Sequence, residues 1–403
     1  MGGIGKTTTA TFLYNYNFLR FEGCSFIADV REVSKQQDGL LLLQKQFLTD
    51  IYKTKNVKLN NIAEGAAMIK DIIRHKKVLV VLDDVDKRDQ LDALVGAQDW
   101  IFPGSKIIIT TRQKRLLGAS EFCKVHRIDN LSDEESLELF SWHAFGKCCP
   151  NHEYEEVSKR AVSYCGGLPL AIKVIGSSLS GNSLNVWISQ LDKLKAIPDS
   201  QILEKLQISY DSLQDDHDKC LFRCLACLFV GSDKDFVVTI LDGCEFYTVV
   251  GFQNLIDRCL LEIDESNMLI MHHLIQEMGR EIVHQESPKE PGERSIVWNH
   301  KDAFHVLREN NGTSAIEGLK LNTCLLKEEA YGSDAFARMN KLKLLQLNHA
   351  HVSGSYKKFP KGLRWLCWHG FSMKCIPGDL SLESIVVLDM QYSRLTNLWK
   401  GTK

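Results

Sequence analysis

Near its start the sequence reads Gly2-Gly3-Ile4-Gly5-Lys6-Thr7-Thr8, and this stretch decides how the first third of the chain is interpreted. It matches most of the pattern Gly-x-x-x-x-Gly-Lys-Ser/Thr, in which glycines let backbone N–H groups face phosphate oxygens. The helix expected to follow adds the positive end of its dipole to the same site. We therefore predict a phosphate-binding loop at residues 2–8, with Lys6 at the β- and γ-phosphates and the Thr7 hydroxyl on Mg²⁺. The alternative is a glycine-rich helix entry without a ligand.

A pair of carboxylates, Asp83-Asp84, stands where a parallel strand is expected to end. The preceding run, Val78-Leu79-Val80-Val81-Leu82, is continuously apolar, as in a strand covered on both faces. A carboxylate at the end of a strand beside a phosphate loop is well placed to hold Mg²⁺. We therefore predict that Asp83 binds Mg²⁺ together with Thr7. We also predict that Asp84 is the catalytic residue, orienting or activating the attacking water. Taken alone, such a pair is typical of a helix cap or a turn.

A third polar group follows the next apolar strand, which we expect at residues 106–111. This strand ends in Thr110-Thr111-Arg112. An arginine at this edge of the sheet can form a charge-assisted bond to a γ-phosphate. We predict that Arg112 binds the nucleotide and reports whether the γ-phosphate is present. Without the phosphate loop, a surface arginine would be the simpler interpretation.

The order of elements predicts the fold class. Strand-like runs at 24–28, 78–82 and 106–111 alternate with helical stretches, which indicates an α/β domain with a parallel sheet. The leading Gly of the loop pattern and the strand before it would precede Met1, so the first strand of this sheet is expected to be missing. Helices follow from about residue 130, where Ser132 and Glu135 form a capping-box pattern. The polar, Pro-containing stretch 285–294 predicts an exposed connection.

The C-terminal part of the chain contains a repeat. The pattern Leu342-x-x-Leu345-x-Leu347 recurs at Leu363-x-x-Leu366-x-Trp368 and at Ile385-x-x-Leu388-x-Met390. Both intervals between its copies lie in the range of about 20–29 residues that is typical of leucine-rich repeats. The sequence therefore predicts the start of a solenoid that is cut short at Lys403.

Composition excludes several classes of protein. Hydrophobic residues make up 44% of the 403 residues and charged residues 25%, which excludes a disordered or fibrous chain. With 49 Lys and Arg against 51 Asp and Glu, net charge gives no reason to expect nucleic-acid or membrane-surface binding. No apolar run approaches the ~20 residues that span a bilayer. Thirteen cysteines and no signal-peptide pattern predict reduced thiols and a cytoplasmic location. The nucleus is a second expected compartment, but neither observation indicates it.

A cysteine cluster offers an alternative chemistry that we reject. Cys220, Cys224 and Cys227 have the spacing of an iron–sulfur triad. They alternate with large apolar residues, however, whereas cluster ligands need a loop that converges on one point. We predict a buried helix in which these cysteines act as small apolar side chains.

Together, the motifs resemble the NB-ARC module of plant intracellular immune receptors, followed by the start of their leucine-rich repeats. The resemblance rests on the phosphate loop, Lys77 to Asp86, Gly104 to Arg112, Gly166-Gly167-Leu168-Pro169-Leu170-Ala171, and Met271-His272-His273. Asp86 and the segment Gln276 to Val283 are similar to receptors that also carry a TIR domain.

This resemblance implies a domain plan and a function. The implied domains are a P-loop nucleotide-binding domain at 1–130, a helical subdomain at 131–200, a winged-helix subdomain at 201–300, a linker at 301–340 and truncated leucine-rich repeats at 341–403. The implied function is a switch that binds ADP at rest and ATP when active, with at most slow ATP hydrolysis. Pro169 would contact the adenine and His272 the ADP β-phosphate.

The resemblance also implies binding partners and a resting state that is less stable than in the family. A pathogen effector or a guarded host protein would bind the repeats, and the active chain would self-associate. His273 stands where the family motif has Asp, which predicts a weaker cap on the following helix and a weaker resting state. Two other functions remain open, namely a truncated receptor scaffold that binds no nucleotide and a P-loop ATPase motor.

Overall fold

The computed structural model describes residues 1–53, 57–96, 101–117, 124–196, 198–322 and 330–398. The chain divides into two compact units, the first formed by residues 1–209 with 257–259 and the second by residues 210–256 with 260–403. The boundary between the units falls within helix α10 (Ser200–Asp211). In the part of the chain that is described, no helix combines the length and the apolar character needed to span a membrane.

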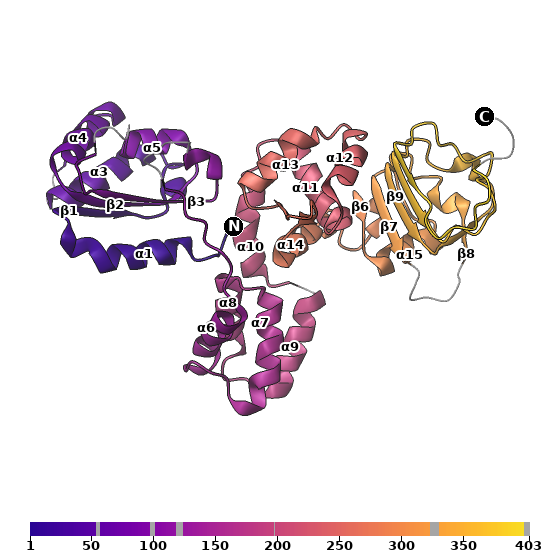
Figure 1. The fold of residues 1–403 in the computed structure, drawn as a ribbon, viewed down its shortest axis with the longest axis horizontal. Coiled ribbons are helices and arrows are strands. Elements are labelled where there is room, and N and C mark those ends of the chain that lie inside the picture. Colours follow the sequence, from indigo (N-terminus) through magenta and orange to yellow (C-terminus); the bar gives the residue numbers. More distant parts are fainter. Residues whose placement is uncertain (54–56, 97–100, 118–123, 197, 323–329, 399–403) are drawn as a thin grey trace. The chain divides into compact units, whose positions relative to one another are not determined.

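A parallel sheet organises the first unit. Its strands β1 (Gly23–Ile27), β2 (Val78–Val85) and β3 (Lys106–Thr111) lie in that order, with β2 in the centre. Residues 78–82 of β2 are all at most 2% exposed, because helices cover both faces of the sheet. Helix α1 (Lys6–Asn17) lies on one face, and α3 (Gly39–Tyr52) and α4 (Ile62–His75) lie on the other (Figure 1). The three predicted strands and the parallel α/β fold are confirmed.

The remaining elements of the first unit are helical. The expected helix start at Ser132 is confirmed, because the Ser132 hydroxyl accepts the Glu135 N–H and the Glu135 carboxylate accepts the Ser132 N–H. Phe140 and Trp187 pack edge to face, with ring centroids 5.7 Å apart, in the interior of this helical part. The helices are α2 (Val30–Val33), α5 (Arg88–Leu94), α6 (Asp133–Phe145), α7 (Glu155–Cys165), α8 (Pro169–Leu179), α9 (Leu184–Ala196) and α10.

The second unit begins with helices and a small antiparallel hairpin. Strands β4 (Glu262–Ile263) and β5 (Leu269–Ile270) form the hairpin, which leads into helix α14 (His273–His284). The predicted exposed connection at 285–294 is only partly exposed. Pro291 and Gly292 are buried, and Arg294 is 2% exposed because its guanidinium group donates to Asp302 and to two backbone carbonyls. The other helices are α11 (Asp216–Cys224), α12 (Lys234–Asp242), α13 (Thr248–Asp257) and α15 (His300–Arg308).

A second parallel sheet forms the C-terminal part of this unit. Its order is β12 (Val387–Asp389), β11 (Trp365–His369), β9 (Leu344–Asn348), β7 (Gly318–Asn322) and β6 (Ile296–Val297). Leu344, Trp365 and Val387 are register partners, so each predicted repeat contributes one strand at the same level. Strand β7 belongs to the same sheet although residues 301–340 were expected to form a linker. Strands β8 (Ala330–Gly332) and β10 (His351–Ser353) pair separately. Residues 399–403 of the predicted repeats lie outside the described residues.

Candidate functional site

The predicted phosphate loop forms a glycine turn at the N-terminus of α1. Gly3 and Gly5 have φ values of 74° and 94°, a conformation that side chains disfavour. A Cβ atom on Gly3 would also lie 2.7 Å from Leu170 Cβ, whereas around Gly5 there is open space. Among the described residues, no side chain caps α1 at Gly5, and its first turn contains no acidic residue. The positive end of this helix is therefore available to an anion.

Helix α8 supports the loop from one side. The Leu170 N–H donates to the Gly3 carbonyl at 3.1 Å, and the Leu170 side chain packs against Gly3. Pro169 is the first residue of α8, where its missing N–H costs no helical hydrogen bond. The structure thus brings the segment that contains Pro169 against the phosphate loop. Ile4 is the buried side chain of the loop, and Thr8 lies in the exposed first turn of α1.

Thr7 and Asp83 meet at the end of β2. The Thr7 hydroxyl is 2.9 and 3.0 Å from the two Asp83 carboxylate oxygens, and the Thr110 hydroxyl donates to Asp83 Oδ1 at 2.6 Å. Asp83 is 3% exposed. These are hard oxygen donors of the kind that Mg²⁺ prefers. The two residues that were predicted to hold the cation are therefore neighbours.

A β-bulge presents the second carboxylate. Leu82 pairs with Ile109 and Val85 with Thr111, so that Asp83 and Asp84 together oppose Thr110. Asp84 has a φ of 57°, and its N–H donates to the Thr110 hydroxyl at 2.9 Å. In a regular strand consecutive side chains point to opposite faces, and the bulge changes the direction of Asp84.

Asp84 lies between two arginines. Its oxygens accept from Arg31 Nε at 2.9 Å and from Arg112 Nε at 3.1 Å. Burial acts against the charged carboxylate, but the attraction of Arg112 and then Arg31 outweighs it and lowers the pKa of Asp84. A carboxylate with a lowered pKa is a weak base. This environment suits orienting a water or an arginine better than removing a proton.

Lys6 and Arg112 place two positive charges beside the loop. Lys6 Nζ donates to the Met1 carbonyl at 2.5 Å. Burial and then repulsion by Arg112 lower the pKa of Lys6 to about 8. Arg112 Nη1 donates to the Lys205 carbonyl at 3.1 Å, and a Cβ atom on Gly2 would lie 2.7 Å from this nitrogen. A phosphate group at the loop would relieve the repulsion between the two cations.

His272 belongs to the second unit, where it begins α14. Its Nδ1 accepts the Leu274 N–H at 3.2 Å, and its ring stacks on His273 with centroids 4.8 Å apart. The helix cap is therefore His272, not residue 273 as the sequence suggested, because His273 is already the first residue of the helix. The role of His272 at a β-phosphate stays a prediction.

The cysteines that we rejected as cluster ligands lie on α11 and on the π-helical turn at Leu225–Phe229. Cys224 and Cys227 are 7% and 3% exposed, and burial raises the pKa of the Cys227 thiol to about 12. Both therefore pack as small apolar groups. Cys220 is only partly buried and instead accepts a hydrogen bond from Arg223 on the same helix.

Two family patterns match the chain. Residues 1–148 match the NB-ARC domain, and residues 215–287 match the winged-helix domain of Roq1-like disease resistance proteins. The chain carries an NB-ARC domain followed by a Roq1-like winged-helix domain. The NB-ARC match covers the predicted phosphate loop, the Asp83–Asp84 bulge and Arg112, so these parts of the candidate site lie within the NB-ARC domain.

Similar proteins extend the match over the whole chain. The disease resistance proteins RPV1 and RUN1 of Vitis rotundifolia are 38% and 37% identical to it over 432 and 433 aligned residues. The TMV resistance protein N of Nicotiana glutinosa is 35% identical over 410 aligned residues. Each alignment covers 100% of this chain but only 31%, 32% and 35% of the respective relative. The chain thus spans about a third of the length of the curated relatives it matches.

The sequence interpretation missed one charged member of the NB-ARC site. Arg31 follows β1 and reaches Asp84 across the carboxyl edge of the sheet. The sequence could have indicated this contact. Strands β1 and β2 were both predicted to be parallel, and residues that follow neighbouring parallel strands lie at the same edge of the sheet. Thr110 was quoted with Arg112, but its bond to Asp83 was not foreseen.

Proposed function

We propose that this chain is the ADP- and ATP-binding switch of a plant immune receptor. The observation that carries the proposal is the contact between Thr7 and Asp83 at the uncapped N-terminus of α1, beside Lys6 and Arg112. A phosphate would find backbone N–H groups, a helix dipole and two cations in one place. Thr7 and Asp83 would hold Mg²⁺, which neutralises phosphate charge when it is bound.

The roles of the other residues follow from their surroundings. Gly2, Gly3, Ile4, Gly5 and Thr8 would shape the loop and the first turn around the phosphates. Arg112, held by Asp84, would turn toward a γ-phosphate, so that the nucleotide state changes the pairing of Asp84. Asp84 would orient the water in slow ATP hydrolysis and not deprotonate it. Pro169 would border the adenine, and His272 would contact the ADP β-phosphate in the resting state.

The names of the relatives support a role in defence, since all three are called resistance proteins. We propose that the complete receptor also carries a TIR domain and acts in the cytoplasm or nucleus. It would perceive a pathogen effector or a guarded host protein through its repeats and self-associate when activated. The switch would respond because ligand contacts made in only one state shift the balance between two states.

The test compares two threonines of one helix. Thr7→Ala removes a proposed Mg²⁺ ligand, while Thr11→Ala, one turn along α1, removes only a bond to the Thr7 carbonyl. In equilibrium dialysis with labelled ATP, we expect Mg²⁺ to strengthen binding to the wild type and to Thr11→Ala, but not to Thr7→Ala. Equal Mg²⁺ dependence in both variants would contradict the assignment of Thr7.

Two further measurements separate this proposal from its rivals. A scaffold that binds no nucleotide would leave the wild-type chain without bound ADP or ATP in the same dialysis. A P-loop motor would release phosphate in many rapid turnovers, whereas a switch should release about one equivalent and stop. Absence of bound nucleotide, or many rapid turnovers, would overturn the proposal that this chain is a nucleotide switch.

A further inference from the structure

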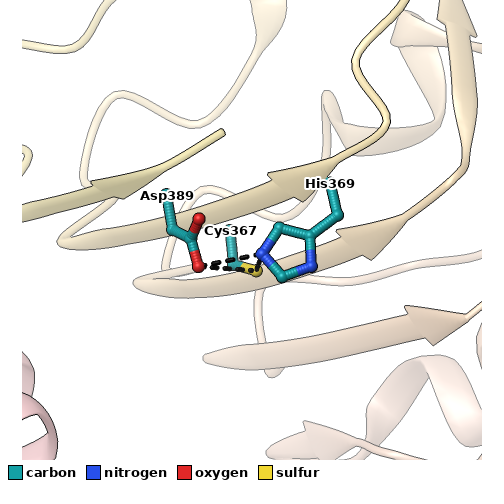
Figure 2. A group of neighbouring side chains, drawn as sticks. All are labelled: Cys367, His369 and Asp389. Carbon is teal, nitrogen blue, oxygen red and sulfur yellow. Dashed lines mark hydrogen bonds and ion pairs between the residues drawn. The ribbon is translucent and has the colours of Figure 1, made fainter. Parts of the chain in front are cut away.

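Three potential metal ligands lie together on the C-terminal sheet. Cys367 and His369 are two residues apart on β11, so their side chains leave the strand on the same face. Asp389 on the parallel neighbour β12 is the register partner of Cys367. Figure 2 shows the three side chains converging from these two strands. Among the described residues, this is the one group of three such side chains whose ligand atoms lie so close together.

The distances between the three ligand atoms fit one small cation. Cys367 Sγ is 3.3 Å from His369 Nε2 and 3.8 Å from Asp389 Oδ2, and Nε2 is 2.9 Å from Oδ2. Ordinary zinc bond lengths in a tetrahedron place a sulfur and a nitrogen about 3.6 Å apart, a sulfur and an oxygen about 3.5 Å, and a nitrogen and an oxygen about 3.3 Å. Each observed distance therefore needs to change by only about 0.4 Å or less.

The geometry argues against a nucleophile with a relay. In a Cys-His-Asp relay, the two ring nitrogens of the histidine contact different partners. Here the same nitrogen, His369 Nε2, faces both the thiol and the carboxylate. A bound cation requires three ligand atoms that face one point. The alternative to a cation is that Cys367 and His369 simply donate hydrogen bonds to the Asp389 carboxylate.

The surroundings hold the ligands in place. Asp389 Oδ1 accepts the Gln391 N–H at 3.2 Å, so the other oxygen, Oδ2, faces Cys367 and His369. Tyr392 packs edge-on against the His369 ring, with centroids 5.9 Å apart. Such supporting contacts are typical of metal sites because they fix ligand orientation. The side chains of His369 and Asp389 are 22% and 21% exposed, whereas Cys367 is 2% exposed, so a cation would enter from the side of His369 and Asp389.

We propose that Cys367, His369 and Asp389 bind one divalent transition-metal ion of the zinc class. Thiolate, imidazole and carboxylate together suit Zn²⁺, whereas Mg²⁺ and Ca²⁺ prefer oxygen ligands. Three protein ligands leave a fourth position for water or for a donor from a partner. The ion would link strands β11 and β12 and so brace two successive repeats. This site is independent of the nucleotide switch.

The experiment uses the full chain, reduced and stripped of metal, with the exposed Cys148 and Cys149 changed to Ser in every sample to lower background binding. Zn²⁺ is titrated in competition with a chromophoric chelator. We expect one tight equivalent, with affinity at least tenfold lower in Asp389→Asn and His369→Gln. The matched controls His351→Gln and Cys375→Ser should bind like the parent. Absence of a tight equivalent in the parent, or equal affinity in all variants, overturns the site.

Cobalt identifies the sulfur ligand directly. Co²⁺ bound by a thiolate gives a near-ultraviolet charge-transfer absorption, which should appear in the parent and in Cys375→Ser but not in Cys367→Ser. An unchanged absorption in Cys367→Ser would overturn the assignment. Asp389→Asn keeps the size of the side chain, and its circular dichroism tests whether it is folded. Zn²⁺ should raise the thermal midpoint of the parent but not that of folded Asp389→Asn, and an equal rise would also overturn the proposal.

Discussion

At the scale of single residues, the NB-ARC site is a small network of charges arranged around two backbone irregularities. The glycine turn frees the N-terminus of α1, and the bulge in β2 separates the directions of Asp83 and Asp84. Asp83 then contacts Thr7, while Asp84 holds Arg31 and Arg112. The pattern of residues predicted the first contact, and the bulge explains why the second carboxylate has different partners.

Lys6 gives a pH dependence with a defined sign. Its pKa falls from 10.5 in the unfolded chain to about 8 in the nucleotide-free protein. The unfolded chain therefore binds the Lys6 proton more tightly, so this group destabilises the nucleotide-free fold fully below pH 8, and the effect fades toward pH 10.5. A bound phosphate favours protonated Lys6 and raises its pKa again. We expect ADP affinity to be constant up to about pH 8 and then to fall by up to tenfold per unit.

Isothermal titration with ADP between pH 7.5 and 10 measures this effect, since ionisation of the terminal phosphate, with a second pKa of about 6, is nearly complete above that lower limit. Lys6→Met should bind more weakly at every pH and lack the decrease that begins near pH 8. A wild-type affinity that stays constant up to pH 10 would show that Lys6 does not contact the phosphates.

Arg31, which the sequence interpretation missed, provides a stability prediction. Its side chain is 12% exposed, and its partner Asp84 is 16% exposed. Arg31→Met removes a hydrogen bond between charged groups in a partly buried place, which should cost about 1–3 kcal/mol. It should also raise the pKa of Asp84, because one of its two cationic neighbours is gone.

The matched control is Arg88→Met, whose ion pair with Asp92 joins side chains that are 66% and 60% exposed. Exposed pairs contribute about 0–1 kcal/mol. Scanning calorimetry of the first unit should therefore show a clearly larger decrease of the midpoint for Arg31→Met. Equal decreases would mean that the contact with Asp84 contributes little to stability.

At the scale of elements, the sequence predicted the helices and strands whose structure depends on neighbouring residues in the chain or on burial of the whole segment. Strand β2 is buried on both faces, and its unbroken apolar run indicates this. Helix α6 begins at a capping box, which is a purely local arrangement. Strand β7 (Gly318–Asn322) was missed although it is as long as β9 and β11 and pairs with β9 from Leu344 onward, 26 residues later and within the range of repeat lengths. Its signal was present, because Ile316-x-x-Leu319-x-Leu321 repeats the spacing of Leu342-x-x-Leu345-x-Leu347, and all three residues are buried.

The segment around Arg294 was predicted to be an exposed connection, but the structure shows it partly buried. Proline and charge usually indicate exposure, but here the guanidinium group donates to the Ser287 and Pro288 carbonyls and to Asp302 Oδ2 at 2.7–3.0 Å. A single buried arginine thus folds a polar stretch back onto α15. Sequence composition gives no sign of this, since the bonds depend on where the carbonyls lie.

Replacing this arginine should therefore be costly. Arg294→Met keeps the length of the side chain but leaves two carbonyls and a carboxylate without their donor. We expect a loss of about 2–4 kcal/mol, below the full value for a buried pair because Asp302 is 31% exposed. Arg308→Met is the control, since Arg308 is 63% exposed. Thermal unfolding of both variants, followed by circular dichroism, tests this, and similar midpoints would contradict the role of Arg294.

At the scale of the whole molecule, the two compact units are stabilised by hydrophobic cores of different construction. The first has a sheet core of Val, Ile and Leu beneath α3 and α4. The second contains a continuous core that runs from α15 through strands β7, β9 and β11, where the repeats are predicted. In such repeated structures each unit contacts mainly its neighbours, so stability accumulates along the chain. Length and the change from alternating strands and helices to a regular leucine pattern predicted more than one domain, and the chain divides into two compact units; the five domain bounds stay a prediction.

The register of the C-terminal sheet has a consequence for how this chain tolerates insertions and deletions. Strands β9, β11 and β12 stay aligned although the interval from Leu344 to Trp365 is one residue shorter than the interval from Trp365 to Val387. The extra residue is absorbed between the strands. One residue inserted within β11 would instead turn Leu366 and Trp368 out of the core, because side chains alternate along a strand. Length variation among descendants of this sequence should therefore accumulate in the connections, while the strands keep their length.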